Sequence, residues 1–379
     1  MNFIRRAVAG AFALLTLFSI GFSGCTAPKD SSNYSDAVRA ISPSATKAVI
    51  LTNEEMTEFV KNYSTFSSAP YWDRSDRYEM SGVTLQWQAD TPALSYEVKL
   101  SLSENLADAQ TFTTAETSLH VNDLYVASTY YWNITAQYES ETLTSKVYSF
   151  MTAATPRTIK IDGVSNTRDL GAVKLPGDKQ LKQGMIYRSA ALEDITESGK
   201  QAALEVYNVK TDLDLRYENE IPTPGVSPLG ETVRYYQYDG CQYASTMSNG
   251  KQVGISGEEM QKTLADTIRL FADESNYPIM FHCAIGRDRT GTLAAILLGL
   301  LGAERDAIVM DYELSFFSKT GCTGDPKTHS QLINAIHSVY EYLNSFDVSD
   351  DFTKCCENFL LHIGITAEEI ASTRSIMLV

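Results

Sequence analysis

The sequence has little positive charge for its length. Its 379 residues include 31 Lys and Arg against 47 Asp and Glu, and the formal net charge is −16. General binding to nucleic acid or to anionic membrane surfaces needs clustered Lys and Arg, so this balance argues against both. An anionic substrate would therefore have to be captured locally, by a few well-placed groups.

Cysteine and histidine are also scarce. The six cysteines show no spacing typical of a zinc site or of a dense disulfide framework. Outside position 282 the histidines, too, show no metal-ligand spacing. We therefore expect no metal ion and no cofactor. With 44% apolar residues, the chain is long enough for about two globular domains with real cores.

The first residues resemble a secretory signal. Arg5 and Arg6 precede an apolar run over residues 7–20, which is too short to span a bilayer comfortably. The segment FSGC that ends at Cys25 resembles the lipobox of bacterial lipoproteins, although Phe22 replaces the usual Leu. The resemblance implies acylation of Cys25 and an exported, membrane-anchored protein of the cell envelope, periplasmic or at the cell surface. An ordinary cleaved signal peptide is the alternative.

Beyond the signal, residues 26–76 are predicted to be a tether and N-terminal extension. Residues 77–153 then show apolar side chains at every second position, which predicts half-buried strands separated by turns. Trp87 and the segment STYYWNITA at 128–136 resemble a fibronectin type III domain with its tyrosine corner. The resemblance implies an all-β, immunoglobulin-like sandwich whose aromatic residues form the core. The partner of this domain is not readable from the sequence.

A phosphate-binding segment is predicted further along the chain. A capping box at Ser256 and Glu259 predicts a helix, and a short apolar strand over 279–281 leads into HCAIGRDRTG. A nearly continuous apolar helix over 293–301 follows and ends at Gly302. A loop that wraps into a helix N-terminus aims several backbone N–H groups at one point, so it forms an anion cradle.

Two side chains give this loop its chemistry. Cys283 at its base would feel the positive end of the helix dipole, which favours the nucleophilic thiolate. Six residues later, Arg289 can bind two phosphate oxygens in a planar fork. Gly286 between them permits backbone angles that a side chain would resist.

This segment resembles the protein tyrosine phosphatase superfamily, whose signature is His, Cys, five residues, Arg and then Ser or Thr. The resemblance implies that Thr290 donates to the sulfur and eases hydrolysis of a phosphocysteine intermediate, and that His282 supports the thiolate. The implied phosphate-binding loop comprises His282, Ala284, Ile285, Gly286, Arg287 and Thr290 around Cys283.

Four further segments extend the resemblance over residues 157–379. NTRDLG at 166–171, GMIYRSAAL at 184–192, TDLDLRYENE at 211–220 and MDYELS at 310–315 are similar to bacterial phosphatases related to secreted mycobacterial and listerial enzymes. The implied fold is α/β, with a central sheet flanked by helices. Those enzymes usually have lysine where this chain has Arg287, so positive charge is kept and phosphoinositide substrates stay open beside phosphotyrosine.

The general acid is open among three aspartates. We place Asp288 first, because its position in the loop resembles that of the acid in myotubularin lipid phosphatases. Asp239 follows a predicted strand where a mobile acid loop lies in many relatives. Asp214 is the third, with the alternative of a structural ion pair to an arginine. Arg188 and Arg168 are candidates for substrate contact or for structural roles.

The sequence therefore predicts a protein-tyrosine phosphatase acting through Cys283 and Arg289. Phosphoserine, phosphothreonine or phosphoinositide hydrolysis by the same chemistry is the runner-up. Two alternatives are of another class. One is a catalytically weak envelope binding module, and the other is sulfur transfer or arsenate reduction at the same loop.

Overall fold

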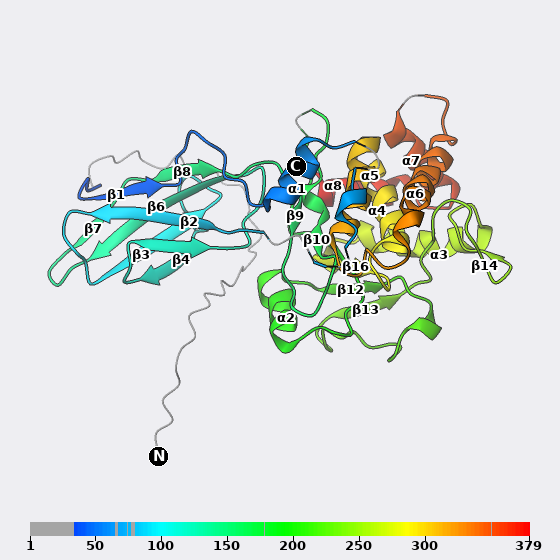
Figure 1. Ribbon diagram of the computed structural model, residues 1–379, viewed down its shortest axis with the longest axis horizontal. Helices are drawn as coiled ribbons and strands as arrows, with labels where there is room; N and C mark the ends of the chain where they lie inside the picture. Colours follow the sequence, from blue (N-terminus) through cyan, green and yellow to red (C-terminus); the bar gives the residue numbers. More distant parts are fainter. Residues whose placement is uncertain (1–33, 65–66, 74, 77–79, 178, 350) are drawn as a thin grey trace, which may run out of the picture. The chain divides into compact units, whose positions relative to one another are not determined.

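The computed structural model describes residues 34–379 except 65–66, 74, 77–79, 178 and 350 (Figure 1). The signal segment and Cys25 lie outside the described residues. The chain forms two compact units, each described here by itself. The N-terminal unit comprises residues 34–49 and 82–153, and the C-terminal unit comprises residues 50–81 and 154–379. Among the described residues, none of the helices combines the length and the apolar character needed to cross a membrane.

The N-terminal unit consists of two antiparallel sheets. One has the strand order β1-β2-β5, and the other has the order β4-β3-β6-β7 with β8 paired to β6. The predicted alternation is confirmed, because the apolar residues of the three runs at 83–87, 96–100 and 130–136 are buried. The strands are β1 Val38–Ser42, β2 Val83–Ala89, β3 Ser95–Ser101, β4 Gln110–Thr114, β5 Ser118–Val121, β6 Thr129–Gln137, β7 Thr142–Thr144 and β8 Tyr148–Met151.

The stretch predicted to be a tether and extension is instead divided between the two units. Strand β1 pairs with β2 and so belongs to the N-terminal unit. Helix α1 (Glu54–Lys61) and the short helix η1 (Ala69–Tyr71) belong to the C-terminal unit. The prediction was wrong here because α1 carries an apolar face. Phe59 of that face is buried against Phe317, with ring centroids 5.0 Å apart.

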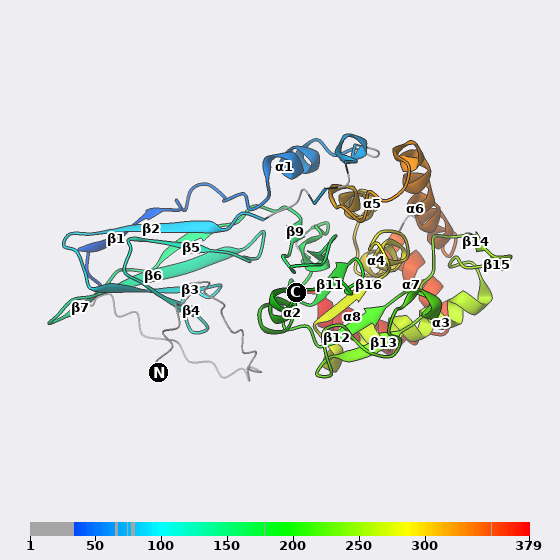
Figure 2. The same ribbon diagram turned by 60° about the horizontal axis from the view of Figure 1, so that its bottom comes forward.

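A six-stranded sheet with the order β13-β12-β16-β11-β10-β9 forms the centre of the C-terminal unit. Strands β13, β12, β16 and β11 are parallel (Figure 2). Strands β10 and β9 add antiparallel pairs at one edge. A small hairpin of β14 and β15 stands apart from this sheet. The strands are β9 Arg157–Thr158, β10 Arg168–Asp169, β11 Ile186–Ser189, β12 Thr211–Asp214, β13 Arg234–Gln237, β14 Met247–Ser248, β15 Lys251–Gln252 and β16 Ile279–His282.

Helices cover both faces of this sheet, so the predicted α/β fold is confirmed. On one face, Ile279 and Phe281 of β16 join a large core with the helices α4, α6 and α7. On the other face, Met280 joins a smaller core with Ala203 and Tyr207, which lie beside α2. The principal helices are α2 Glu197–Gln201, α3 Glu258–Arg269, α4 Asp288–Leu300, α5 Arg305–Glu313, α6 His329–Asn344, α7 Phe352–His362 and α8 Ala367–Met377.

The order of strand, loop and buried helix is as predicted around residue 283. Strand β16 ends at His282, the loop covers 283–287, and α4 begins at Asp288. Gly302 follows α4 with a positive φ of 99°, in keeping with a glycine helix stop. The predicted capping box at Ser256 was wrong. Helix α3 begins at Glu258 with Gly257 as its N-cap, because the Ser256 hydroxyl donates to the carbonyl of Ala244 instead.

Candidate active site

Cys283 lies at the base of the loop, where β16 ends and α4 is about to begin. Its side chain is buried, and burial by itself would raise the pKa of the thiol. The positive charge of Arg289 and the neighbouring hydroxyl and backbone N–H of Thr290 oppose that effect, and the net result is a lowered pKa of Cys283. The Thr290 hydroxyl is buried and has no hydrogen-bond partner among the described residues, which leaves it available to the sulfur. The site therefore favours a thiolate.

The loop turns its backbone N–H groups toward the sulfur because its carbonyls are held from outside. The Ala284 carbonyl accepts from the N–H of Ala191 at 3.2 Å, and Asn166 Nδ2 donates to the carbonyls of Ile285 and Gly286 at 3.0 and 2.9 Å. In a trans peptide the C=O and the following N–H point in opposite directions. Carbonyls that point outward therefore leave the next three N–H groups pointing into the cradle.

Gly286 is required where the loop turns most sharply. Its φ is 69°, and a Cβ atom there would lie 2.3 Å from the carbonyl oxygen of Ser189. Both observations exclude a side chain at this position. The sequence reading of Gly286 as a conformational requirement is confirmed.

Arg289 is preorganised by a carboxylate. Its two terminal nitrogens donate to the two oxygens of Glu220 at 2.5 and 2.8 Å, and one of them also reaches the carbonyl of Leu215 at 3.4 Å. Burial lowers the pKa of Arg289, but Glu220 and the charge of Cys283 more than offset this, so the guanidinium stays charged. The ring of Tyr217 lies 5.1 Å from the guanidinium carbon. Among the described residues the Nε of Arg289 has no hydrogen-bond partner and the second terminal nitrogen has only Glu220, so a charged group with donors to spare stands next to the nucleophile.

Arg168 and Arg188, considered from the sequence as substrate contacts, are buried behind the loop. Both pair with Asp311, and Arg188 also donates to the carbonyl of Gly286 at 2.8 Å. Burial raises the pKa of Asp311, but the two guanidinium groups lower it to below its usual range overall. Of the two roles that the sequence left open for these arginines, the contacts support the structural one, because Asp311 and the loop carbonyl take up their guanidinium groups. Together with Asn166, they hold the loop in shape.

His282 lies on the far side of the nucleophile, within a buried carboxylate pair. Its Nε2 is 3.0 Å from Asp212 Oδ1, and its Nδ1 is 3.8 Å from Asp214 Oδ1. Burial lowers the pKa of His282, but the negative charge of Asp212, with a smaller effect of Asp214, raises it to about 9. His282 is therefore a buried imidazolium at neutral pH.

The structure separates the three aspartates considered as general acids. Asp214 is 1% exposed and accepts from Arg216 at 2.7 Å, so the reading of Asp214 as a structural ion pair is the correct one. Asp288 Oδ1 accepts from Tyr243, Tyr312 and Arg287 at 2.5, 3.2 and 2.8 Å. Its Oδ2 has one long contact, to Arg287 at 3.4 Å. One oxygen of Asp288 is anchored and the other is nearly free.

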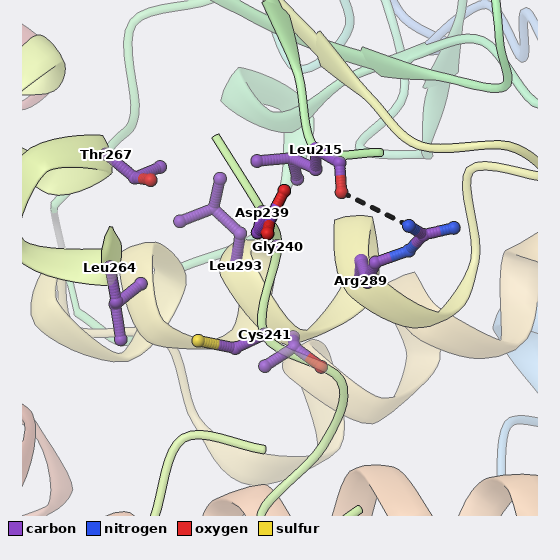
Figure 3. Close-up of a pocket in the computed structure, with 9 residues that line it drawn as sticks. Leu215, Asp239, Gly240, Cys241, Leu264, Thr267, Arg289 and Leu293 are labelled. Carbon is purple, nitrogen blue, oxygen red and sulfur yellow. Dashed lines mark hydrogen bonds between the residues drawn. The ribbon is translucent and has the colours of Figure 1, made fainter. Parts of the chain in front are cut away.

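Asp239 lies on the other side of Arg289. It is exposed, accepts from Gln237 at 3.1 Å and lines a small pocket together with Arg289 and Cys241 (Figure 3). Burial raises the pKa of the Cys241 thiol to about 12, so this second cysteine is an unreactive, protonated neighbour. Among the described residues no group of three His, Cys, Asp or Glu side chains could hold a metal ion.

Several residues that shape the site were missed at the level of the sequence. Asn166, Glu220 and Asp311 each stand inside a segment that the resemblance had marked, but the partners that give them their roles are 69 to 143 positions away. The only signal for these residues in the sequence was that the four segments of the resemblance occur in the expected order. Tyr312 lies in the same marked segment as Asp311, whereas Tyr243, which also holds Asp288, lies in none of the four segments.

A reactive thiol in an anion cradle, with an arginine fork beside it and an α/β fold behind it, defines a cysteine-dependent phosphatase. The tyrosine phosphatase family matches residues 159–379, which is more than half of the chain. The chain belongs to this family.

Individual relatives are distant. The triple specificity protein phosphatase PtpB of Mycobacterium tuberculosis is 25% identical over 190 residues, which cover 40% of this chain and 67% of PtpB. A tyrosine-protein phosphatase of Nostoc commune is 28% identical over 141 residues, covering 34% of this chain and 47% of the relative. The chain thus spans about half to two thirds of these curated relatives. The core catalytic domain of the PP-IP phosphatase SIW14 from S. cerevisiae, solved with citrate, matches 41% of this chain and 83% of its own at 19% identity, with a TM-score of 0.28.

Proposed function

We propose that this protein hydrolyses phosphomonoesters through a phosphocysteine intermediate, with phosphotyrosine in proteins as its leading substrate. The observation that carries the proposal is the Cys283 thiol of lowered pKa, placed where loop N–H groups and Arg289 converge. The same groups that stabilise the thiolate can bind the three non-bridging oxygens of a phosphate.

The proposed reaction has two steps. The Cys283 sulfur attacks phosphorus, the ester P–O bond breaks, and the leaving oxygen takes a proton from a carboxyl group. Water then attacks the phosphocysteine while the same carboxylate takes its proton, the S–P bond breaks, and phosphate leaves. Arg289 and the loop N–H groups hold the transferring oxygens throughout.

We propose Asp288 as that carboxyl group. Its Oδ1 is fixed by three donors, which leaves Oδ2 to face the leaving oxygen. Asp239, exposed beside Arg289, is the alternative. Replacing the acid with asparagine should remove the fall in activity at high pH and cost about 10²- to 10⁴-fold in kcat. An unchanged pH profile in Asp288→Asn, with a flattened one in Asp239→Asn, would transfer the role.

Phosphoserine, phosphothreonine and phosphoinositides form the second substrate class, and the relative PtpB, which is called a triple specificity phosphatase, supports testing them together. The test measures hydrolysis of phosphotyrosine peptides, phosphoserine peptides and phosphoinositides by the full-length chain, with and without EDTA, and compares it with hydrolysis by Cys283→Ser. Metal-independent turnover that Cys283→Ser abolishes would support the mechanism. No turnover, or turnover indifferent to the substitution, would favour a binding module that only recognises phosphate.

For the N-terminal unit we propose a fibronectin type III-like sandwich. The Tyr130 hydroxyl accepts from the backbone N–H of Tyr125 at 2.7 Å, five residues upstream, as in a tyrosine corner. Trp87 and Tyr96 are buried with ring centroids 5.4 Å apart. Both observations fit a domain whose aromatic residues form its core.

We further propose export and acylation at Cys25. The proposal rests on the sequence of residues 1–25 alone. Metabolic labelling with a fatty acid, compared between the wild type and Cys25→Ala, tests it: the label should appear on the wild type alone and the variant should leave the membrane fraction.

A further inference from the structure

The second arginine of the loop, Arg287, faces away from the phosphate cradle. Its side chain is 6% exposed, and each of its nitrogens has a protein acceptor. Nε donates to Asp288 Oδ1 at 2.8 Å, one terminal nitrogen donates to the carbonyls of Gly321 and Thr323 at 2.6 and 3.1 Å, and the other reaches Asp288 Oδ2 at 3.4 Å. The Nε and the first terminal nitrogen are therefore fully used, and only the second terminal nitrogen keeps donor capacity.

Two aromatic rings lie beside the same guanidinium. Its carbon lies 5.8 Å from the ring of Phe316 and 6.0 Å from that of Trp72, and these two rings stack on each other with centroids 5.0 Å apart. A guanidinium packed beside aromatic rings gains cation–π attraction and loses access to water. Withdrawing Arg287 toward a substrate would break both sets of contacts.

Trp72 belongs to a part of the chain that lies outside the family match at 159–379. Its segment is held by buried polar contacts. The Ser68 hydroxyl donates to Glu313, the Ser68 N–H donates to the same carboxylate at 3.0 Å, and the Ser68 hydroxyl lies 2.8 Å from His329 Nε2. Ser68 and Glu313 are 0% exposed. The segment is therefore an integral part of the C-terminal unit.

We propose that Arg287 is a positioning residue, which orients Asp288 and the chain at 321–323 with Trp72 as its cover, and that it does not contact the substrate. The inference rests on the proposed phosphatase function and deepens it. A loop whose second cation is buried and bound to protein acceptors offers little for the additional phosphates of a phosphoinositide. The substrate class that fits is a monoester with a single phosphate, as in a phosphotyrosine protein.

The first test is steady-state kinetics of the full-length chain on a phosphotyrosine peptide and on a short-chain phosphatidylinositol trisphosphate. We expect the wild type to prefer the peptide. Arg287→Met should lower kcat about 10- to 100-fold, because a displaced Asp288 no longer meets the leaving oxygen, and KM should stay nearly unchanged. Arg287→Lys, which keeps the charge but not the fork, should restore part of kcat.

A substrate-selective result would overturn the inference. If Arg287 bound additional phosphates, Arg287→Met would raise KM for the trisphosphate and leave the phosphotyrosine peptide unaffected. A wild type that turns over neither substrate would instead overturn the proposed function, so the two failures are distinguishable.

Trp72→Leu provides an independent test with a matched control. It should reproduce the loss of kcat, although the ring contacts of Trp72 are with Phe316, His329 and Arg287, none of which is proposed here to bind phosphate. Tyr71→Leu removes a neighbouring ring that stacks on Phe317 at 4.3 Å and not on Arg287. It should lower Tm but leave kcat intact below the unfolding transition. Equal losses of kcat in the two variants would refute a specific role of Trp72.

Discussion

The buried imidazolium of His282 predicts a loss of stability at alkaline pH. Its pKa is raised from 6.5 to about 9, mainly by Asp212, so the folded state holds this proton more tightly than the unfolded state. The stabilisation is complete below about pH 6.5 and disappears as pH rises through about 9. A difference of this size corresponds to roughly 3 kcal/mol of unfolding free energy. That is a large part of the stability of an ordinary domain.

Urea unfolding of the C-terminal unit, followed at several pH values between 6 and 10, measures this loss. Cys283 has the opposite effect, because a thiol whose pKa is lowered on folding adds stability as pH rises toward 9. The measurement is therefore made in Cys283→Ser, which removes that contribution. Asp212→Asn in the same background should flatten the decline, since it removes the charge that holds the proton. A flat profile in Cys283→Ser, or a full decline in the double variant, would refute the reasoning.

Three further outcomes follow from contacts in the site. Glu220→Gln should reduce kcat/KM about tenfold or more in steady-state assays, because Arg289 loses the partner that fixes its fork. Asp311→Asn should destabilise the fold by about 3–5 kcal/mol in urea unfolding, because Arg188 is left as a buried charge without its carboxylate. Thr290→Ala should move the alkylation of the nucleophilic cysteine by iodoacetamide to higher pH, because the thiolate loses a hydrogen bond.

The reactive loop was readable from the sequence because its determinants are local. Strand β16, the loop and helix α4 are contiguous, and each has its own signal: apolar residues, a glycine at a turn with φ of 69°, and an apolar helix closed by Gly302. Alternating apolar residues in the N-terminal strands were equally direct, since the periodicity of a strand is visible in a few residues.

The residues that hold the loop in place could not be predicted from the sequence, because their roles depend on contacts between residues far apart in the chain. Nothing near Arg188 or Arg168 indicates that both share Asp311, more than 120 positions away. Burial decides their role, and burial of an arginine is a property of the folded chain. The same holds for Arg287: its charge was visible in the sequence, whereas its direction depends on carbonyls at 321 and 323 and on a ring from another segment.

The order of segments along the chain explains why the contact between Trp72 and Arg287 could not be predicted from a division of the sequence into consecutive domains. Strand β1 belongs to the N-terminal unit, residues 50–81 cross into the C-terminal unit, and β2 returns to the N-terminal unit. A domain boundary drawn once, after residue 153, assigns Trp72 to the wrong side. Trp72 covers the arginine that orients Asp288, so the folded unit that would carry out catalysis includes residues that precede strands β2 to β8 in the sequence as well as residues that follow them. This unit is larger than the family match at 159–379.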